Sequence, residues 1–185
     1  MRRFIAVLMM LSLLFSGCGK KTNSMQQALN FRTALLSANG CVFTADVTIE
    51  YPEKTYDFSM DCSFTDDEAT VTITKPETIA GICAVFHGKT AALEFQGVSL
   101  EFGTLANGYV APLATPWILG SAWCEDYISA AGKDGDYDRV TWLKGYNDEE
   151  LTIDTWFEDN IPIYAEISYD GARVLQVKIS GFVYR

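Results

Sequence analysis

The fold of this chain is decided by residues 41–64, CVFTADVTIEYPEKTYDFSMDCSF. Apolar residues occupy the odd positions from Cys41 to Tyr51 and the even positions from Tyr56 to Phe64, and most of the intervening residues are polar. This alternation predicts two half-buried strands, because successive side chains of a strand point to opposite faces. Pro52-Glu53-Lys54 predicts the turn between them. The segment therefore predicts a β-hairpin with one apolar face.

Similar alternation recurs along the rest of the chain, with short turns between the segments. Further strands are predicted at residues 69–74, 79–86, 90–95, 98–102, 139–143, 151–157, 163–169 and 174–182. Short turns join antiparallel neighbours, whereas parallel strands need long crossovers, and the pattern shows no regular alternation of strands with helices. The sequence therefore predicts an antiparallel meander of about ten strands.

Two segments have helical features. Ser24 predicts the N-cap of a helix over residues 25–36, and Asn39-Gly40 predicts its left-handed end. Thr115-Pro116 predicts the start of a second helix that continues through residues 117–128. The first two turns of this second helix are apolar on nearly all sides, so other parts of the protein must cover it. The chain is therefore predicted to be mainly β with α (α+β), with an N-terminal helix and a mid-chain helix.

The N-terminus has the pattern of an export signal. Arg2 and Arg3 precede an apolar run over residues 4–15, which is shorter than the roughly 20 residues of a membrane-spanning helix. The following Ser16-Gly17-Cys18 resembles the bacterial lipobox, in which signal peptidase II cuts before the cysteine and the new terminus is acylated. Phe15 stands where the lipobox usually has Leu, Val or Ile, and an ordinary secretory signal that contains a cysteine is the alternative.

The lipobox interpretation divides the chain into three parts. Residues 1–17 are predicted to be a signal peptide, residues 18–23 a lipidated tether, and residues 24–185 one domain. Acyl chains on Cys18 would hold the protein at the membrane, because each buried methylene contributes about 0.8 kcal/mol. The predicted location is extracytoplasmic, anchored to the bacterial cell membrane by lipidated Cys18.

The chain is strongly acidic. Its 14 basic and 24 acidic residues give a net charge of −10, and removal of residues 1–17 takes away Arg2 and Arg3 and leaves −12. Nucleic acid is not an expected partner, because phosphate binding depends on clustered Lys and Arg. The same charge repels anionic lipid, so the acyl chains are expected to hold the protein at the membrane while its body is repelled.

Four cysteines follow Cys18, and an even number in an exported chain predicts disulfides. Cys41 and Cys62 lie on the same face of the first predicted hairpin and are the favoured pair. Their Cα atoms come within about 7 Å only if a bulge or a slipped register is present. Cys83 and Cys124 are left to pair with each other or to stay free.

Motifs for catalysis or metal binding are weak. His87, the one histidine, belongs to a His-Gly-Lys turn, and no nucleophile with a family signature lies near it in the sequence. The cysteines contain no Cys-x-x-Cys pair for zinc. Asp134, Asp136 and Asp138 have the first spacings of a calcium loop, but Gly145 stands where that loop needs a bidentate Glu. The chain is therefore predicted to be no enzyme and to hold no cofactor or metal, and an envelope hydrolase is an alternative without a supporting motif.

The order of helix, meander, mid-chain helix and closing strands resembles the LolA/LolB lipoprotein-carrier superfamily. Residues 72–79, TITKPETI, and the later His87-Gly88-Lys89-Thr90 are similar to the family's strand that ends in a basic residue and proline and to its Gly-Lys turn. Residues 162–171, PIYAEISYDG, resemble its last hairpin. The resemblance covers residues 24–183, extends to lipoproteins of spore-forming clostridia, and matches none of a carrier's cargo-release residues. It implies an unclosed antiparallel half-barrel around an apolar groove, with the mid-chain helix as a lid.

The apolar face of the sheet and the mid-chain helix have two alternative roles, because a ligand groove and an ordinary core both place apolar side chains on one face. As a groove, they would bind an acyl chain, a lipoprotein or another apolar ligand, and the chain would be a membrane-anchored envelope lipoprotein. The candidate ligand-binding residues are Phe43, Val47, Ile49, Phe58, Met60, Ile73, Trp117, Ile118 and Trp123. As a core, they would leave a non-enzymatic interaction scaffold that docks an envelope or spore protein through its acidic surface.

Overall fold

The computed structural model describes residues 24–51, 54–88, 90–95, 97–103, 105–106, 109–145 and 150–185. The predicted signal peptide, Cys18 and the tether lie outside these residues. Within the described ranges, no helix combines the length and the apolar character that a membrane crossing needs.

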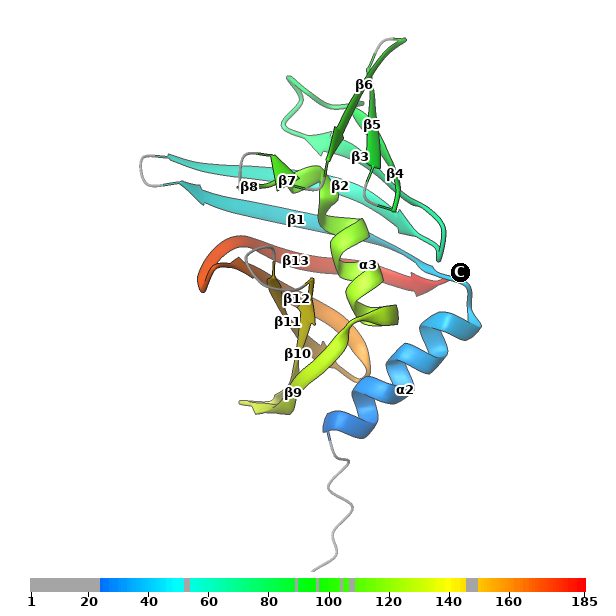
Figure 1. Cartoon of the computed structure of the whole chain (residues 1–185), viewed down its shortest axis with the longest axis vertical. Helices are drawn as coiled ribbons and strands as arrows, with labels where there is room; N and C mark the ends of the chain where they lie inside the picture. Colours follow the sequence, from blue (N-terminus) through cyan, green and yellow to red (C-terminus); the bar gives the residue numbers. More distant parts are fainter. Residues whose placement is uncertain are drawn as a thin grey trace, which may run out of the picture.

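One curved antiparallel sheet of 11 strands forms the body of the protein (Figure 1). Its strands are β1 (Cys41–Tyr51), β2 (Lys54–Phe64), β3 (Ala69–Lys75), β4 (Cys83–His87), β5 (Thr90–Phe95), β6 (Val98–Gly103), β9 (Tyr127–Asp134), β10 (Tyr137–Lys144), β11 (Leu151–Glu158), β12 (Ile161–Tyr169) and β13 (Ala172–Tyr184). Their order is β6-β5-β4-β3-β2-β1-β13-β12-β11-β10-β9. The two outermost strands do not pair with each other, which confirms the predicted unclosed half-barrel. The short strands β7 (Leu105–Ala106) and β8 (Tyr109–Val110) form a separate two-stranded sheet.

The strand order places the first and the last strand side by side in the middle of the sheet. β1 pairs with β2 on one side and with β13 on the other. Strands β2 to β6 and strands β9 to β12 therefore form two wings that are joined through β1 and β13. The backbone amide of Arg185 donates to the carbonyl of Gly40 at 3.0 Å, which fastens the end of the chain beside the start of β1.

The β1–β2 hairpin follows the alternation of its sequence. Its pairing runs without interruption from Cys41 opposite Phe64 to Tyr51 opposite Lys54. Because directly opposed residues share a face, the odd positions of β1 and the even positions of β2 point to the same side of the sheet. The regular pairing contains neither the bulge nor the slipped register that a Cys41–Cys62 disulfide requires.

Both helices lie on the concave side of the sheet (Figure 1). α2 (Ser24–Ser37) ends where Asn39 and Gly40 take φ angles of 58° and 131°, which confirms the predicted left-handed end. The 3-10 turn η1 (Pro112–Ala114) leads into α3 (Thr115–Glu125). α3 is shorter than predicted, because Tyr127 already begins the edge strand β9. The residues of β9 do not predict a strand, since small and polar side chains interrupt their alternation.

α3 fills the space that the half-barrel encloses. Nine of its 11 residues are buried, and Ile118, Leu119 and Trp123 have no exposed surface. Gly120 allows the helix to pack directly on β2, because a Cβ at this position would lie 2.2 Å from the ring of Phe64. On the opposite wing, the indole Nε1 of Trp123 donates to Oγ1 of Thr155 in β11 at 3.1 Å. The mid-chain helix therefore joins both wings into one core.

Candidate ligand-binding site

The nine predicted ligand-binding residues come together in one apolar cluster between the sheet and α3. Seven of them are buried, while Phe58 and Trp117 are half-buried. Met60, Ile118 and Trp123 have no exposed surface, because α3 packs against the sheet. In this closed arrangement α3 occupies the groove that these residues would line.

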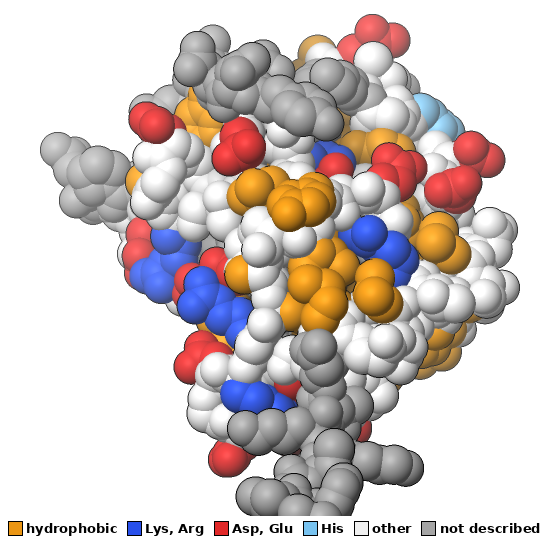
Figure 2. Space-filling model, turned by 60° about the horizontal axis from the view of Figure 1, so that its bottom comes forward, with side chains coloured by type: hydrophobic (Ala, Val, Ile, Leu, Met, Phe, Trp, Pro, Cys, Tyr) orange, Lys and Arg blue, Asp and Glu red, His pale blue; other side chains and the backbone are white. Residues whose placement is uncertain are grey.

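A cleft of about 670 Å³ opens beside this core, between α2, the end of α3 and β9. Its lining residues are Met25, Leu29, Arg32, Glu125, Asp126, Tyr127, Ile128, Leu143, Gly145 and Glu150. Figure 2 shows hydrophobic side chains gathered near the middle of the face that carries the start of α2, with basic side chains beside them. The lining thus combines five apolar side chains with four charged ones, and none of the nine predicted residues belongs to it.

The sequence does not predict this cleft, because its walls come from segments that lie far apart in the chain. One signal was available on the first helix. Met25, Leu29 and Arg32 recur at a spacing of four and three residues, which places them on one helix face. Nothing in the sequence shows that β9 would lie opposite that face.

Arg32 forms the inner end of the cleft and binds the last turn of α3. Its Nε donates to the carbonyl of Trp123 at 2.7 Å, and its Nη2 donates to the carbonyls of Ala122 at 3.2 Å and Asp126 at 2.5 Å. The last carbonyls of a helix have no partner within the helix, so a guanidinium there satisfies several acceptors at once. Burial lowers the pKa of Arg32, and the side chain nevertheless remains a cation at neutral pH.

Lys144 of β10 holds the same end of α3 from the other side. Its Nζ donates to Oγ of Ser121 at 2.8 Å and to Oδ2 of Asp126 at 3.2 Å. Burial raises the pKa of Asp126, and the Lys144 cation offsets part of this effect. Two cations from different elements therefore fix the position of α3 next to the cleft.

The start of α2 is tied to the sheet through Asp138 of β10. Ser24 donates from Oγ to Oδ1 of Asp138 at 2.6 Å, and Lys133 donates from Nζ to Oδ2 at 2.9 Å. Burial raises the pKa of Asp138, but the hydrogen bonds from Ser24 and Lys133 outweigh this effect and hold the pKa below its ordinary value. Of the three aspartates with calcium-loop spacing, Asp134 accepts a hydrogen bond from Nε1 of Trp156 at 2.8 Å, and the described residues contain no acidic cluster that could hold a metal ion.

All four cysteines of the described domain are free thiols in the structure. Cys41 lies opposite Phe64 and Cys62 lies opposite Phe43, so the two cysteines are diagonal neighbours on adjacent strands. Burial raises the pKa of Cys41 to about 12 and that of Cys124 to about 11. Such thiols are protonated at neutral pH and react slowly. The Cys41–Cys62 pairing is not formed here and stays a prediction.

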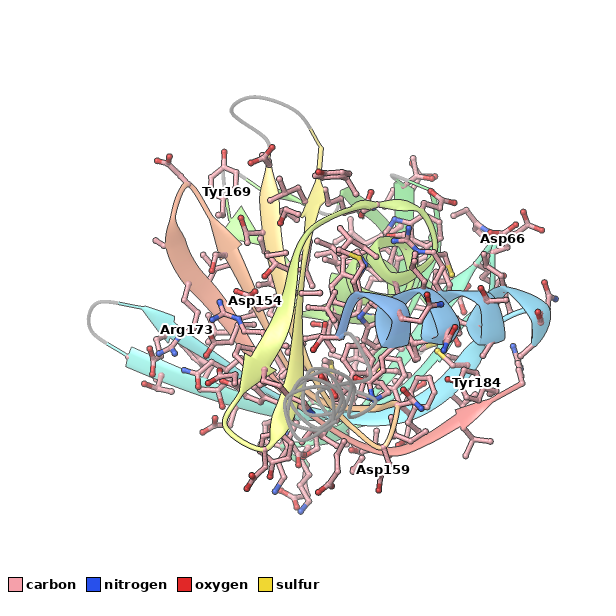
Figure 3. All side chains as sticks on the ribbon, turned by 90° about the horizontal axis from the view of Figure 1, so that it is seen from below. Asp66, Asp154, Asp159, Tyr169, Arg173 and Tyr184 are labelled. Atoms are coloured by element: carbon pink, nitrogen blue, oxygen red, sulfur yellow. The ribbon has the colours of Figure 1, made fainter. Side chains whose placement is uncertain are left out.

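The convex face of the sheet carries an ordered polar network. Arg139 binds both carboxylate oxygens of Asp154, at 3.1 Å and 2.8 Å. Arg173 bridges Glu166 at 3.0 Å and Glu50 at 3.3 Å. Figure 3 shows the labelled Asp154 and Arg173 away from α2, whereas Tyr184 lies beside that helix. This face is therefore polar, and part of its charge is paired within these two clusters.

His87 lies apart from the cleft, at the end of β4. Its side chain is exposed, and its Nε2 lies 3.6 Å from Oε2 of Glu68. An exposed pair of this kind is typical of a protein surface.

Comparison with known proteins establishes the fold. No family model matches the sequence, and no curated protein matches it. A LolA superfamily protein from Nitrosomonas europaea aligns with a TM-score of 0.50 and 12% identity, over 88% of this chain and 94% of that chain. A domain assigned to outer-membrane lipoprotein sorting in Vibrio parahaemolyticus aligns with a TM-score of 0.56 and 7% identity, over 88% of this chain and 92% of that chain. The fold is LolA-like.

A LolA-like fold agrees with the family resemblance of the sequence. At identities of 12% and 7%, the likeness concerns the fold alone, and a shared fold hosts different functions. The function of this LolA-like chain has to be argued from its own side chains.

Proposed function

We propose that this chain is a membrane-anchored lipoprotein of the bacterial envelope that binds an apolar ligand, such as an acyl chain or a lipoprotein, without catalysing a reaction. The observation that supports the proposal is the cleft of about 670 Å³ beside the end of α3, half of whose lining residues are apolar, within a LolA-like half-barrel. Burial of hydrocarbon against its walls would contribute about 25 cal/mol per Å² of apolar area.

The position of the cleft fits a ligand that comes from a membrane. α2 begins at Ser24, six residues after Cys18, and an extended tether of that length reaches at most about 20 Å. Met25 and Leu29 of the first two turns line the cleft. Acyl chains on Cys18 would therefore hold the open side of the cleft close to the lipid surface.

The cleft and the closed groove are separated by the last turn of α3. Arg32 and Lys144 bind this end of α3 through hydrogen bonds, so a ligand in the cleft could reach buried groove residues such as Trp123 only if the turn moved. In the proposed function the ligand occupies the cleft first, and it would contact the buried residues of the predicted groove only after that movement.

The test is the binding of a fluorescent fatty-acid analogue to the mature protein and to two variants. Leu29→Ser removes an apolar wall of the cleft at a side chain that is 43% exposed, so the fold should tolerate it. Leu36→Ser is the matched control, because Leu36 is 51% exposed on the same helix but does not line the cleft. We expect Leu29→Ser to weaken binding several-fold and Leu36→Ser to leave it unchanged. Absence of binding to the unmodified protein, or an equal effect of both variants, contradicts the proposal.

A second candidate function is an interaction scaffold, favoured by the observation that α3 fills the concave side of the sheet. In that case the core is structural, and the acidic surface docks another protein of the envelope. Lipid extraction and mass spectrometry of the purified protein separate the two functions, because a scaffold would carry no ligand apart from its own anchor.

A further inference from the structure

The edge strand β6 exposes apolar side chains at one end of the sheet. Val98 is 69% exposed and Leu100 is 63% exposed. Leu100 lies opposite Leu93 and Val98 lies opposite Phe95 in the β5–β6 pairing, so these four residues share one face. Figure 1 shows the β5–β6 hairpin projecting from the body of the protein, away from α2.

An unpaired strand edge with exposed apolar side chains favours association with another strand. Soluble proteins usually protect such an edge with charges, prolines or a covering segment. β6 has one charged residue, Glu101, and its second edge has no partner among the described strands. We propose that β6 pairs antiparallel with β6 of a second copy of this chain, around a two-fold axis at Leu100.

The sequence of β6 fits this register. With the axis at Leu100, each Leu100 lies opposite that of the second copy, Ser99 lies opposite Glu101, and Val98 lies opposite Phe102. A shift by one residue would place Leu100 opposite Glu101 and would match an apolar face with a polar one. A shift by two residues toward the C-terminus would place the two Glu101 side chains opposite each other, and like charges at that position repel.

The paired edges are short, and this determines where the association occurs. A stable interface buries about 1,200–2,000 Å² in total, which two six-residue strand edges do not reach alone. Attachment of both copies to one membrane raises their effective concentration and compensates for a weak contact. This part of the inference rests on the proposed lipid anchor at Cys18, whereas the register of β6 does not.

Disulfide trapping tests the axis directly. Residues directly opposite each other have Cβ atoms about 4.5–5.5 Å apart, which is close enough for a disulfide after a small adjustment. Leu100→Cys is introduced together with Cys83→Ser, because Cys83 is half-buried and free. The matched control is Val183→Cys in the same background, since Val183 is 57% exposed on β13, where it pairs with Val42 of β1 and lies on a different strand from the proposed interface.

The mature protein is oxidised mildly in membranes, and the Cys18→Ala form is oxidised in solution at increasing concentration. We expect Leu100→Cys to form several-fold more disulfide-linked dimer than Val183→Cys in membranes. If Leu100→Cys and Val183→Cys form equal amounts of linked dimer, both in membranes and in solution, the β6 interface is overturned. Excess dimer in solution but not in membranes supports the β6 pairing and overturns the inference that membrane attachment promotes it. If Leu100→Cys is instead linked to a different protein, as the mass of the linked species would show, the proposal that a second copy of this chain is the partner is also overturned.

Discussion

Arg32 connects three parts of the molecule through one side chain. It extends from α2, binds three carbonyls at the end of α3 and lines the cleft. Lysine could keep the positive charge at this place, but its single ammonium cannot reproduce the planar fork that reaches several acceptors. The geometry of Arg32 therefore matters more than its charge.

We expect Arg32→Lys to lower the free energy of unfolding by about 1–3 kcal/mol, because hydrogen bonds from charged groups contribute about 1.5–3 kcal/mol each and lysine can keep some of them. Urea denaturation measures this change. Arg173→Lys is the control, because Arg173 also contacts more than one acceptor, here two carboxylates on the exposed convex face, and the substitution should leave stability unchanged. Equal effects of the two substitutions would show that Arg32 acts through charge alone.

The stability that Asp138 contributes by holding the start of α2 depends on pH, and the direction of this dependence follows from its pKa. Its pKa is lowered in the folded protein, so the unfolded chain takes up a proton first as the pH falls. The stabilisation by Asp138 is therefore complete above the ordinary aspartate pKa of about 3.9 and is lost as the pH falls through the lower folded value. Asp126 has a raised pKa in the folded protein, so its effect has the opposite sign. Its contribution to the free energy of unfolding falls as the pH rises.

Asp138→Asn should therefore reduce the loss of stability between neutral pH and about pH 3, relative to the unmodified protein. Thermal unfolding at a series of pH values measures this difference. The control is Asp136→Asn, because Asp136 lies exposed in the neighbouring turn. A pH profile that is identical for Asp138→Asn and the unmodified protein would contradict the assignment.

The contact between α3 and β2 depends on the absence of a side chain. Gly120 lies against the ring of Phe64, and Phe64 also approaches Gly40 at the start of β1, where a Cβ would lie 2.0 Å from the carbonyl oxygen of Phe64. Phe64 is thus enclosed by two glycines from different elements. A glycine inside a helix lowers helix stability by about 1 kcal/mol relative to alanine, and close packing offsets this cost.

Gly120→Ala should destabilise the protein by about 1–3 kcal/mol, because overpacking of a filled core outweighs the improved helix propensity. The matched control is Gly132→Ala in β9, where no atom lies within 4 Å of an added Cβ. Thermal and urea unfolding of both variants measure the effect. If Gly120→Ala were as stable as the unmodified protein or more stable, α3 would not pack on Phe64 as described.

For the whole molecule, the sequence predicts the architecture better than the site. Residues 41–64 specify their hairpin because alternation with one buried face leaves a single register that covers the apolar side chains. The partners of Arg32 lie 90 to 94 residues away, and no periodicity reports such a contact. Only Ile128 and Ala131 of β9 are half-buried, and a register shift lies between them, so burial does not impose the regular alternation that would reveal the strand. The cleft depends on the long-range contacts of Arg32 and on the position of β9, so the sequence does not predict it.

The pairing of β1 with β13 has a consequence for the order in which the protein acquires its structure. Residues 41–48 can complete their hydrogen bonding only after residues 176–184 have become available. If the chain crosses a membrane from its N-terminus, the wing from β2 to β6 emerges long before its central partner, and contacts between distant residues form slowly. Until then β1 and its apolar face are open to other chains, so this protein passes through an aggregation-prone interval that lasts until its final strand has been delivered.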